Sequence, residues 1–355
     1  MQIKHSKPSI NEKDVSRAVQ ILSSGKLADY SQVKRFEGEM ANYIGQKEGI
    51  AVNSGTNALH LALLALDGKN SKDEVIIPSY VCIALLNAIT AANLKPRIVD
   101  INKNDYNIYL DEIKKKINTK TKAVIVPHMF GDPIKNIEEI VEQMVNLNVP
   151  IIEDCALSVG AGIKGKKIGN FSDLSVFSFY ATKVLTTGHG GMILSKSEKL
   201  LDKLKDFMQY DNREFYKESF NFRMTDFQAA VGRNQLLRLP DFIKRRREIA
   251  KIYNESFKNQ SNIKIPSRPE ESIFFRYILE VEDVNKFIDE MSKENISCAK
   301  PIFKPLHQYF NLDKNNFPNT EKAHKHSVSI PLYPALKDNE VKYVVENVLK
   351  SMKKL

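Results

Sequence analysis

Val176-Phe177-Ser178-Phe179-Tyr180-Ala181-Thr182-Lys183 opens the most informative stretch of this sequence, which ends in Thr186-Thr187-Gly188-His189-Gly190-Gly191. It begins as a strand and enters a turn of small residues, where a ligand can approach the backbone closely. A lysine taken at random from the 53 lysine and arginine residues is usually a solvated surface side chain. Here a buried strand precedes Lys183, and loss of water would lower the pKa of its amine. Lys183 can therefore act as a nucleophile, and the Ser178 hydroxyl can donate to a phosphate.

Seven short runs rich in β-branched residues, including this one, alternate with helical segments between residues 49 and 195. Each run is too short for a core helix, and the segments between them carry apolar residues at helical spacing. This alternation predicts an α/β fold whose central sheet is mostly parallel and covered by helices. The expected strands are 50–52, 75–77, 97–101, 123–126, 149–153, 174–179 and 192–194, and the expected helices are 56–66, 81–92, 110–116 and 133–147.

The regions on either side of this series have patterns of their own. An N-terminal helix is predicted outside the main sheet, with Asn11 as its cap, Gly25 as its stop and apolar Val15, Val19 and Leu22 at helical spacing. Further helices are expected at 198–209, 225–239 and 241–257, with Pro240 separating the last two. A small α+β domain should follow, with strands at 274–281, 296–299 and 327–332 and helices at 284–294 and 338–352. We divide the chain into a large domain, residues 1–240, and a small C-terminal domain, residues 241–355.

Composition excludes several classes of protein. The chain has 355 residues, of which 42% are hydrophobic, enough for a large core beside a smaller one. Its apolar stretches are too short or too interrupted to span a bilayer, and residues 1–8 lack the apolar segment of a secretory signal, so we expect a cytoplasmic protein. Cys82, Cys155 and Cys298 are odd in number and far apart, which predicts reduced thiols and no zinc site.

The net charge of +10 could attract nucleic acid, an anionic membrane or phosphorylated small molecules. The basic runs at 114–116, 164–167 and 244–247 are separate, and solvation explains each of them. No recognition helix or basic patch interleaved with aromatic residues accompanies them, so no nucleic-acid or membrane partner is expected. A phosphorylated substrate is compatible with the charge but does not follow from it.

Two more strand ends carry polar residues at the edge where a parallel sheet binds its ligand. Asn53-Ser54-Gly55-Thr56 lies between a strand and a helix, where a glycine and free N–H groups can hold a phosphate. Ser54 acting only as a helix cap is an equally good interpretation. Glu153-Asp154 ends an apolar strand, and such an acid usually caps the next turn. Alternatively it holds a cationic ring nitrogen, because a buried carboxylate stays charged only beside a positive partner.

The three strand ends together supply an anion cradle, a carboxylate for a ring nitrogen and an amine for an aldehyde. Pyridoxal 5'-phosphate asks for these three groups. A nicotinamide cofactor would ask for Gly-x-Gly-x-x-Gly after the first strand, which the chain lacks.

The chain resembles the DegT/StrS group of fold-type I aminotransferases, which act mostly on keto sugars. The resemblance covers nearly the whole length, in order, and no metal site is part of it. Its motifs are Phe36-Glu37, Ser54-Gly55-Thr56-Asn57-Ala58-Leu59-His60, Asp73-Glu74-Val75-Ile76-Ile77-Pro78-Ser79, His128-Met129-Phe130-Gly131, Glu153-Asp154, Ser178-Phe179 with Lys183, Asn221-Phe222-Arg223-Met224 and Pro331-Leu332-Tyr333-Pro334.

The resemblance implies a role for each matching position. Lys183 is the Schiff-base lysine, and Asp154 contacts the pyridinium nitrogen. The phosphate contacts are Ser54, Gly55, Thr56 and Ser178. Asn221 reaches the phosphate of the neighbouring subunit's cofactor, which makes the active unit a homodimer. A dehydratase branch of the family carries histidine where this chain has Lys183, so the resemblance implies amino transfer.

Some positions depart from the family pattern. Cys82 stands where an aromatic residue commonly stacks on the cofactor ring. Either Tyr80 substitutes for that aromatic residue, or this face of the ring is less covered. Leu157 replaces a glutamine near the ring's phenolic oxygen. His128 and His307 lie near family motifs, and we assign neither a role.

The resemblance implies an aminotransferase that moves an amino group from L-glutamate or a similar donor to a keto sugar. The acceptor is expected to be nucleotide-linked and to serve the synthesis of a surface polysaccharide, such as a capsule, or a glycan. A small phosphorylated ketone such as a triose phosphate is an alternative acceptor. A non-catalytic regulatory protein that keeps the fold is more remote, because a sensor does not need Lys183, Asp154 and Ser178 together.

Overall fold

A seven-stranded sheet forms the centre of the computed structural model, which describes residues 2–28, 30–66 and 73–354. The strand order is β1-β9-β8-β5-β4-β2-β3, and β9 is antiparallel to both of its neighbours while the other pairs are parallel. The predicted mostly parallel α/β sheet is confirmed. The strands are β1 Glu48–Val52, β2 Glu74–Pro78, β3 Lys95–Val99, β4 Thr121–Pro127, β5 Ile151–Asp154, β8 Leu174–Ser178 and β9 Gly191–Ser195.

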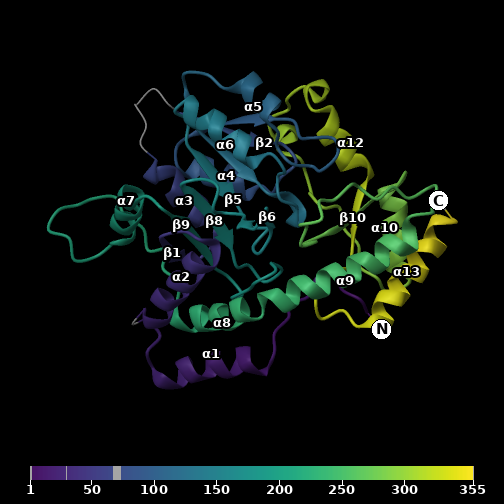
Figure 1. Ribbon diagram of the computed structural model, residues 1–355, viewed down its shortest axis with the longest axis horizontal. Coiled ribbons are helices and arrows are strands. Elements are labelled where there is room, and N and C mark those ends of the chain that lie inside the picture. Colours follow the sequence, from purple (N-terminus) through teal and green to yellow (C-terminus); the bar gives the residue numbers. More distant parts are fainter. Residues whose placement is uncertain (1, 29, 67–72, 355) are drawn as a thin grey trace.

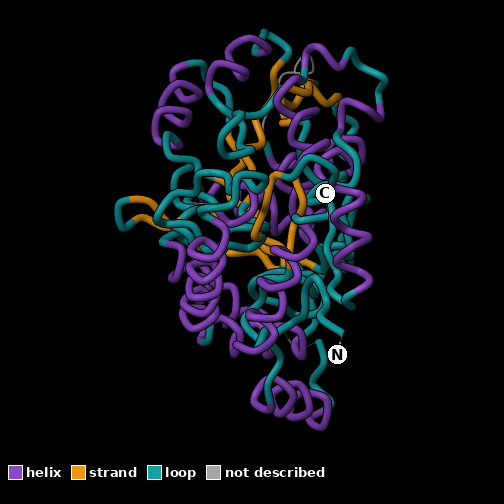
Figure 2. The backbone as a smooth tube through the Cα atoms, turned by 90° about the vertical axis from the view of Figure 1, so that its right-hand side faces the viewer, coloured by secondary structure: helices purple, strands orange, loops and turns teal. Residues whose placement is uncertain are grey.

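Both faces of this sheet are buried, which explains why its strands are continuous apolar runs. Side chains alternate along a strand. In β4, Val124 and Val126 enter one hydrophobic core, while Ala123 and Ile125 enter the core on the other face. Figure 2 shows strands through the middle of the molecule with helices on either side.

The helices of the large domain agree with the predicted pattern within a few residues at most ends. The structure begins the helix predicted at 81–92 at Ala84 and the one predicted at 133–147 at Ile137. Pro240 lies in the first turn of the helix it was expected to delimit, where its missing N–H costs no hydrogen bond. The helices are α1 Glu12–Ser24, α2 Ser31–Ile44, α3 Gly55–Ala65, α4 Ala84–Ala91, α5 Leu110–Lys116, α6 Ile137–Asn146, α7 Glu198–Met208, α8 Asp226–Leu237 and α9 Leu239–Phe257.

The C-terminal part forms a small α+β unit with its own hydrophobic core, to the right in Figure 1. Strands β10 Tyr277–Glu280 and β11 Ser327–Ile330 pair antiparallel. Helices α10 Val284–Lys293 and α13 Asp338–Met352 contact each other, and α9 reaches this unit from below the main sheet. The unit confirms the small α+β domain, while its boundary after residue 240 stays a prediction.

Some elements differ from the sequence-based expectation. Residues 296–299 form only isolated bridges. Ile296 pairs with Ile3 and Ala299 pairs with Ser329, and neither pairing extends beyond one residue on each side. The strand predicted there is wrong. Five further elements were not predicted. They are helix α2, whose N-cap residue Tyr30 makes no side-chain cap, the strands β6 Gly162–Ile163 and β7 Lys166–Lys167, which form a hairpin, and the short helices α11 Leu306–Tyr309 and α12 Pro318–His326.

Helix α1 lies outside the main sheet against α8, as predicted (Figure 1). Asn11 and Asp14 form a capping box, and Gly25 ends the helix in the left-handed conformation. Buried Asp14 also accepts a hydrogen bond from Arg238 at 2.7 Å, which ties α1 to the end of α8. The apolar stripe of α1 faces solvent, with Val15, Val19 and Leu22 each about half exposed.

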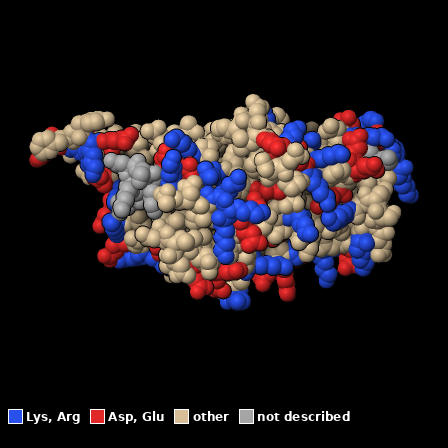
Figure 3. Space-filling model, turned by 90° about the horizontal axis from the view of Figure 1, so that it is seen from above, with Lys and Arg blue, Asp and Glu red and all other residues tan. Residues whose placement is uncertain are grey.

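Charge is mixed over the surface seen from above in Figure 3, where lysine and arginine side chains are interspersed with acidic ones. Within the described ranges no helix is long and apolar enough to cross a membrane. The three cysteines are free thiols.

Candidate active site

A cavity of about 400 Å³ opens at the carboxyl ends of β5 and β8, the edge where a parallel sheet binds ligands. Six of the seven predicted site residues line it: Ser54, Gly55, Thr56, Asp154, Ser178 and Lys183. The seventh, Asn221, does not line this cavity. Residues from four separate strand ends and loops therefore meet at one place.

Helix α3 points its N-terminus at the cavity. An α-helix leaves its first N–H groups without intrahelical acceptors. The Ser54 hydroxyl accepts one of them, from Asn57 at 3.1 Å, so the capping interpretation holds. Ser54 and the next two residues also line the cavity, so capping and anion binding are compatible.

Gly55 is required by a close approach rather than by its backbone angles. A Cβ atom there would lie 2.8 Å from the Ser178 Cβ and 3.3 Å from the Ser178 Cα. The first turn of α3 therefore sits directly against the end of β8. This contact brings the helix N-terminus and the Ser178 hydroxyl to the same end of the cavity.

The two acids at the end of β5 have different environments. Glu153 accepts hydrogen bonds from the N–H groups of Gly169, Phe171 and Ser172 at 2.8 to 2.9 Å. Burial favours its neutral form, but hydrogen bonds from His128 and the backbone outweigh burial and lower its pKa. Glu153 thus anchors a loop.

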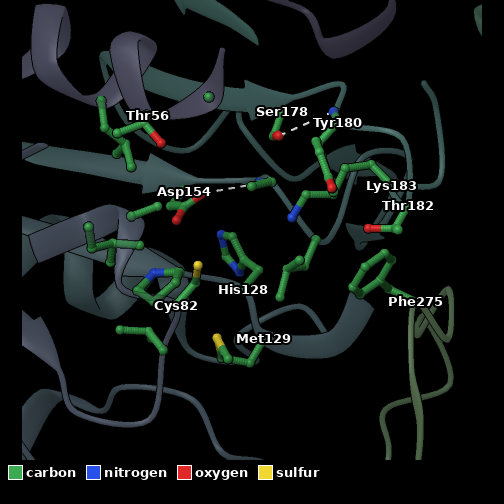
Figure 4. A pocket seen from close by; sticks show the side chains of 18 of the residues that line it. Thr56, Cys82, His128, Met129, Asp154, Ser178, Tyr180, Thr182, Lys183 and Phe275 are labelled. Atoms are coloured by element: carbon green, nitrogen blue, oxygen red, sulfur yellow. Dashed lines mark hydrogen bonds between the residues drawn. The ribbon is translucent and has the colours of Figure 1, made fainter. Parts of the chain in front are cut away.

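Asp154 points into the cavity, as Figure 4 shows. Burial raises its pKa, while the hydrogen bond from the Ala156 N–H at 3.0 Å and the charge of Lys183 oppose the rise. A buried carboxylate with one backbone partner can bind a cation in the cavity.

Lys183 enters the cavity from the turn after β8 (Figure 4). Its N–H donates to the Tyr180 carbonyl at 2.9 Å, which closes the turn. Burial lowers the pKa of Lys183 to about 8, although Asp154 opposes the shift. Its Nζ lies 5.4 Å from the centroid of the Phe275 ring.

The end of the same turn passes close to helix α3. A Cβ atom on Gly191 would lie 2.4 Å from the Ser54 carbonyl oxygen, so only glycine fits there. Gly55 at the start of α3 and Gly191 at the start of β9 thus allow the lysine turn and the α3 N-terminus to share one site.

His128 also faces the cavity (Figure 4). Its Nδ1 accepts from the Ile134 N–H at 3.2 Å, so Nε2 carries the proton and donates to Glu153 at 3.3 Å. These bonds fix the tautomer and the plane of the ring. His307 lies outside the cavity and is held by Ser79 and Glu321.

The residues expected around a cofactor ring are only partly in place. Cys82 and Leu157 line the cavity. Tyr80 is fully buried against Tyr106 and Phe130 and does not line it, so its candidacy as the ring-stacking residue is wrong. The conformation of the loop sends its side chain into the hydrophobic core instead.

Sequence reasoning missed the wall that the small domain contributes. This wall includes Phe275, Arg276, Pro301 and Ile302. The first two immediately precede β10, and their run of aromatic and basic residues was assigned only to a strand. No local signal indicates that this strand end faces Lys183.

Asn221 lies exposed in the loop between α7 and α8, which projects from the body of the molecule in Figure 1. The loop carries Phe215 and Tyr216, which are 82% and 97% exposed. Asn221 precedes Phe222, whose carbonyl accepts a hydrogen bond from the Asn53 N–H at 2.7 Å, but Asn221 does not line its own chain's cavity.

The carboxyl edge of this sheet meets the three demands of pyridoxal phosphate with a helix N-terminus, a buried acid and an amine of lowered pKa. The glycine contacts leave room for a phosphate beside Ser178. This places the protein in the class of fold-type I pyridoxal-phosphate enzymes. A model of the DegT/DnrJ/EryC1/StrS aminotransferase family matches residues 8–349, and the chain belongs to this family.

Related proteins agree with this assignment. The GDP-perosamine synthase of Escherichia coli O157:H7 is 32% identical, over 96% of this chain and 96% of its own. The dTDP-3-amino-3,6-dideoxy-alpha-D-galactopyranose transaminase of Aneurinibacillus thermoaerophilus is 33% identical, over 95% of each. The aminotransferase TlmJ from Streptoalloteichus hindustanus superposes with a TM-score of 0.92 at 26% identity, covering 99% of both chains.

A solved structure from Streptococcus pneumoniae in its PLP form superposes with a TM-score of 0.90 at 26% identity, covering 100% of this chain and 99% of that one. The protein is thus an aminotransferase that uses pyridoxal phosphate.

Proposed function

We propose that this aminotransferase transfers an amino group from L-glutamate to a nucleotide-linked keto sugar, for a surface polysaccharide such as a capsule or for another glycan. The observation that carries the proposal is the meeting of Lys183, with its lowered pKa, and buried Asp154 in one cavity. The acceptor class rests on relatives named for amino sugars, and on a spore coat polysaccharide biosynthesis protein of Bacillus subtilis, 32% identical over 97% of this chain and 95% of its own.

Each site residue has a role that its position supports. Ser54, Gly55, Thr56 and Ser178 hold the cofactor phosphate at the α3 N-terminus. Asp154 pairs with the protonated ring nitrogen. Lys183 binds the cofactor through its amine and, once released, moves a proton between two carbon atoms.

The chemistry of transfer divides between protein and cofactor. When bound, pyridoxal phosphate supplies an aldehyde for the amino group and a ring that accepts electrons from the carbon losing its proton. Asp154 keeps the ring nitrogen protonated by offering it a negative partner. The lowered pKa of Lys183 leaves a fraction of its amine neutral near physiological pH, and the neutral amine can accept the proton.

We place this chemistry in a homodimer in the cytoplasm. Exposed Phe215 and Tyr216 on the α7–α8 loop, and the exposed stripe of α1, are apolar surface that a second copy would cover. Asn221 in that loop would then reach the phosphate in the partner's site.

The absorbance spectrum of the purified protein before and after adding L-glutamate tests the donor half of the reaction. A visible cofactor band that disappears with glutamate supports the proposal, and Lys183→Ala should lack that response. A cofactor band indifferent to glutamate would contradict the proposed donor.

The acceptor half needs its own test. Enzyme first converted with glutamate is separated from the donor and mixed with a GDP-linked or dTDP-linked keto sugar, or with dihydroxyacetone phosphate. Return of the visible band with a nucleotide-linked sugar supports the proposal. A response to the triose phosphate alone would favour the small phosphorylated ketone.

A further inference from the structure

Arg276 is a cation on the cavity wall that pairs with no carboxylate among the described residues. It lines the cavity just before β10, and its guanidinium carbon lies 4.8 Å from the Phe275 ring centroid. No ion pair found in residues 2–28, 30–66 and 73–354 involves Arg276. Burial lowers the pKa of Arg276 to about 10, which still leaves it charged near neutral pH. A cation held out of water in this way favours an anionic ligand.

His5 holds the guanidinium in place without neutralising it. An arginine only donates, so the His5 Nδ1, 3.2 Å from Arg276 Nη1, is the acceptor. The His5 Nε2 then donates to the Ser329 hydroxyl at 2.9 Å. Burial, with the charge of Arg276, lowers the pKa of His5 to about 3, so the ring is neutral.

Two other arginines near Arg276 are already engaged. Arg246 donates to the carbonyls of Phe274, Phe275 and Leu332 at 3.1 to 3.2 Å and does not line the cavity. Arg268 pairs with buried Asp132. Arg276 is therefore the arginine of this group that a substrate can reach.

Lys183 and Arg276 contact the same aromatic ring, at 5.4 and 4.8 Å from its centroid. The charge of Arg276 also contributes to the lowered pKa of Lys183, so the two side chains lie in the same part of the cavity. An anion bound by Arg276 would therefore lie on the side of the cavity where the Lys183 amine acts. In an amino acid, the α-carboxylate is attached to the carbon that bears the amino group. In a nucleotide-linked sugar, the ring separates the diphosphate from the ketone.

We propose that Arg276 binds the α-carboxylate of the amino donor, with His5 as a positioning residue for its guanidinium. The inference rests on the proposed amino transfer from L-glutamate. The planar guanidinium can take a carboxylate through two parallel hydrogen bonds, which a lysine cannot reproduce. Arg276 therefore selects α-amino acids over simple amines as donors.

Arg276→Gln and Arg276→Lys test this assignment in the cofactor-loaded enzyme. Single-turnover absorbance measurements give the L-glutamate concentration for half-maximal rate, and calorimetry gives the Kd of 2-oxoglutarate as a readout apart from turnover. For Arg276→Gln we expect this concentration and this Kd to rise roughly ten- to a hundredfold, because charge-assisted hydrogen bonds are lost. The rise should be smaller for Arg276→Lys. The KM of the acceptor should change little. Lys304→Gln is the matched control, because it removes a cation that contacts the Tyr309 ring and does not line the cavity. It should change neither the L-glutamate concentration for half-maximal rate nor the Kd of 2-oxoglutarate.

A comparison of donors separates carboxylate recognition from general loss of function. The wild type should prefer L-glutamate to 4-aminobutanoate, which lacks the α-carboxylate, and Arg276→Gln should narrow that preference. If the variant binds glutamate and 2-oxoglutarate as the wild type does, the inference is overturned. A rise confined to the acceptor KM would also overturn it and would assign Arg276 to the diphosphate of the acceptor. If Arg276→Gln loses the cofactor, the same comparison is made with Arg276→Lys. A wild type that ignores glutamate would instead contradict the proposed function.

Discussion

Lys183 owes its chemistry to a balance between burial and a nearby acid. Burial lowers the pKa of its amine to about 8, and the charge of Asp154 limits that shift. A solvated lysine with a pKa near 10.4 would carry almost no neutral amine at physiological pH. The side chain is thus partly deprotonated in the range where a cell would use it.

This balance predicts how cofactor uptake depends on pH. Below pH 8 the amine is mostly protonated and cannot attack an aldehyde, and above pH 8 it is mostly neutral. The rate at which cofactor-free protein gains the visible band on mixing with pyridoxal phosphate should rise about tenfold per pH unit below this point and then level off. Stopped-flow absorbance over the range measures it, with Lys183→Ala as the blank. A rate that keeps rising far above pH 8 would show that the amine has an ordinary pKa.

At the scale of the elements, the site depends on how closely α3 approaches β8. The first turn of α3 touches Ser178 through Gly55, and no side chain fits between them. Such a contact fixes the distance between the helix N-terminus and the Ser178 hydroxyl. The phosphate position is therefore set by packing of two elements rather than by one residue.

Gly55→Ala should weaken cofactor binding while leaving the fold intact. The added methyl group would lie 2.8 Å from the Ser178 Cβ, so α3 or β8 must shift. We expect the Kd of pyridoxal phosphate to rise tenfold or more, about 1.4 kcal/mol or more of binding free energy. Titration followed by absorbance measures this Kd.

Gly38→Ala is the matched control, because nothing lies within 4 Å of a Cβ there and the residue is in the middle of α2. It should raise the free energy of unfolding by about 0.5–1 kcal/mol without changing cofactor affinity. Equal affinities in the two variants would mean that α3 and β8 can separate without harm to the phosphate site.

At the scale of the whole molecule, the exposed aromatic residues on the α7–α8 loop are the surface that most needs a partner. Phe215 and Tyr216 are almost fully exposed, and Asn221 in the same loop does not line its own chain's cavity. A homodimer would cover the aromatics and bring Asn221 to the other site.

Mixed dimers test that arrangement. Lys183→Ala lacks the amine, and Asn221→Ala should bind pyridoxal phosphate more weakly. The two variants are refolded together or left to exchange subunits. If Asn221 acts across the interface, a mixed dimer has one intact site, with Lys183 from one subunit and Asn221 from the other. Turnover of the mixture at limiting cofactor should then exceed that of either variant alone. No gain on mixing would mean that Asn221 serves its own chain, or no site. Glu214→Ala, exposed in the same loop, should behave as wild type throughout.

Much of the fold follows from local pattern. The seven strands of the sheet, the capped ends of α1 and the cap at Ser54 were predictable because hydrophobic period and capping residues act over a few neighbours. Helix α2 was predictable too, since Val33, Phe36 and Met40 are spaced as a buried helical face. Its cap was not predictable, because the first N–H groups of the helix donate to the carboxylate of Asp226, which is far away in the sequence.

The sequence by itself determined the α/β order and the residues at the strand ends, including Lys183, Asp154 and Ser178, because each belongs to a short segment with a recognisable pattern. Only the tertiary structure decided that Tyr80 enters the core and that Arg276 reaches the cavity. It also left the apolar stripe of α1 exposed. Burial and charge at these positions come from segments far apart in the chain, and no local pattern encodes which segments meet.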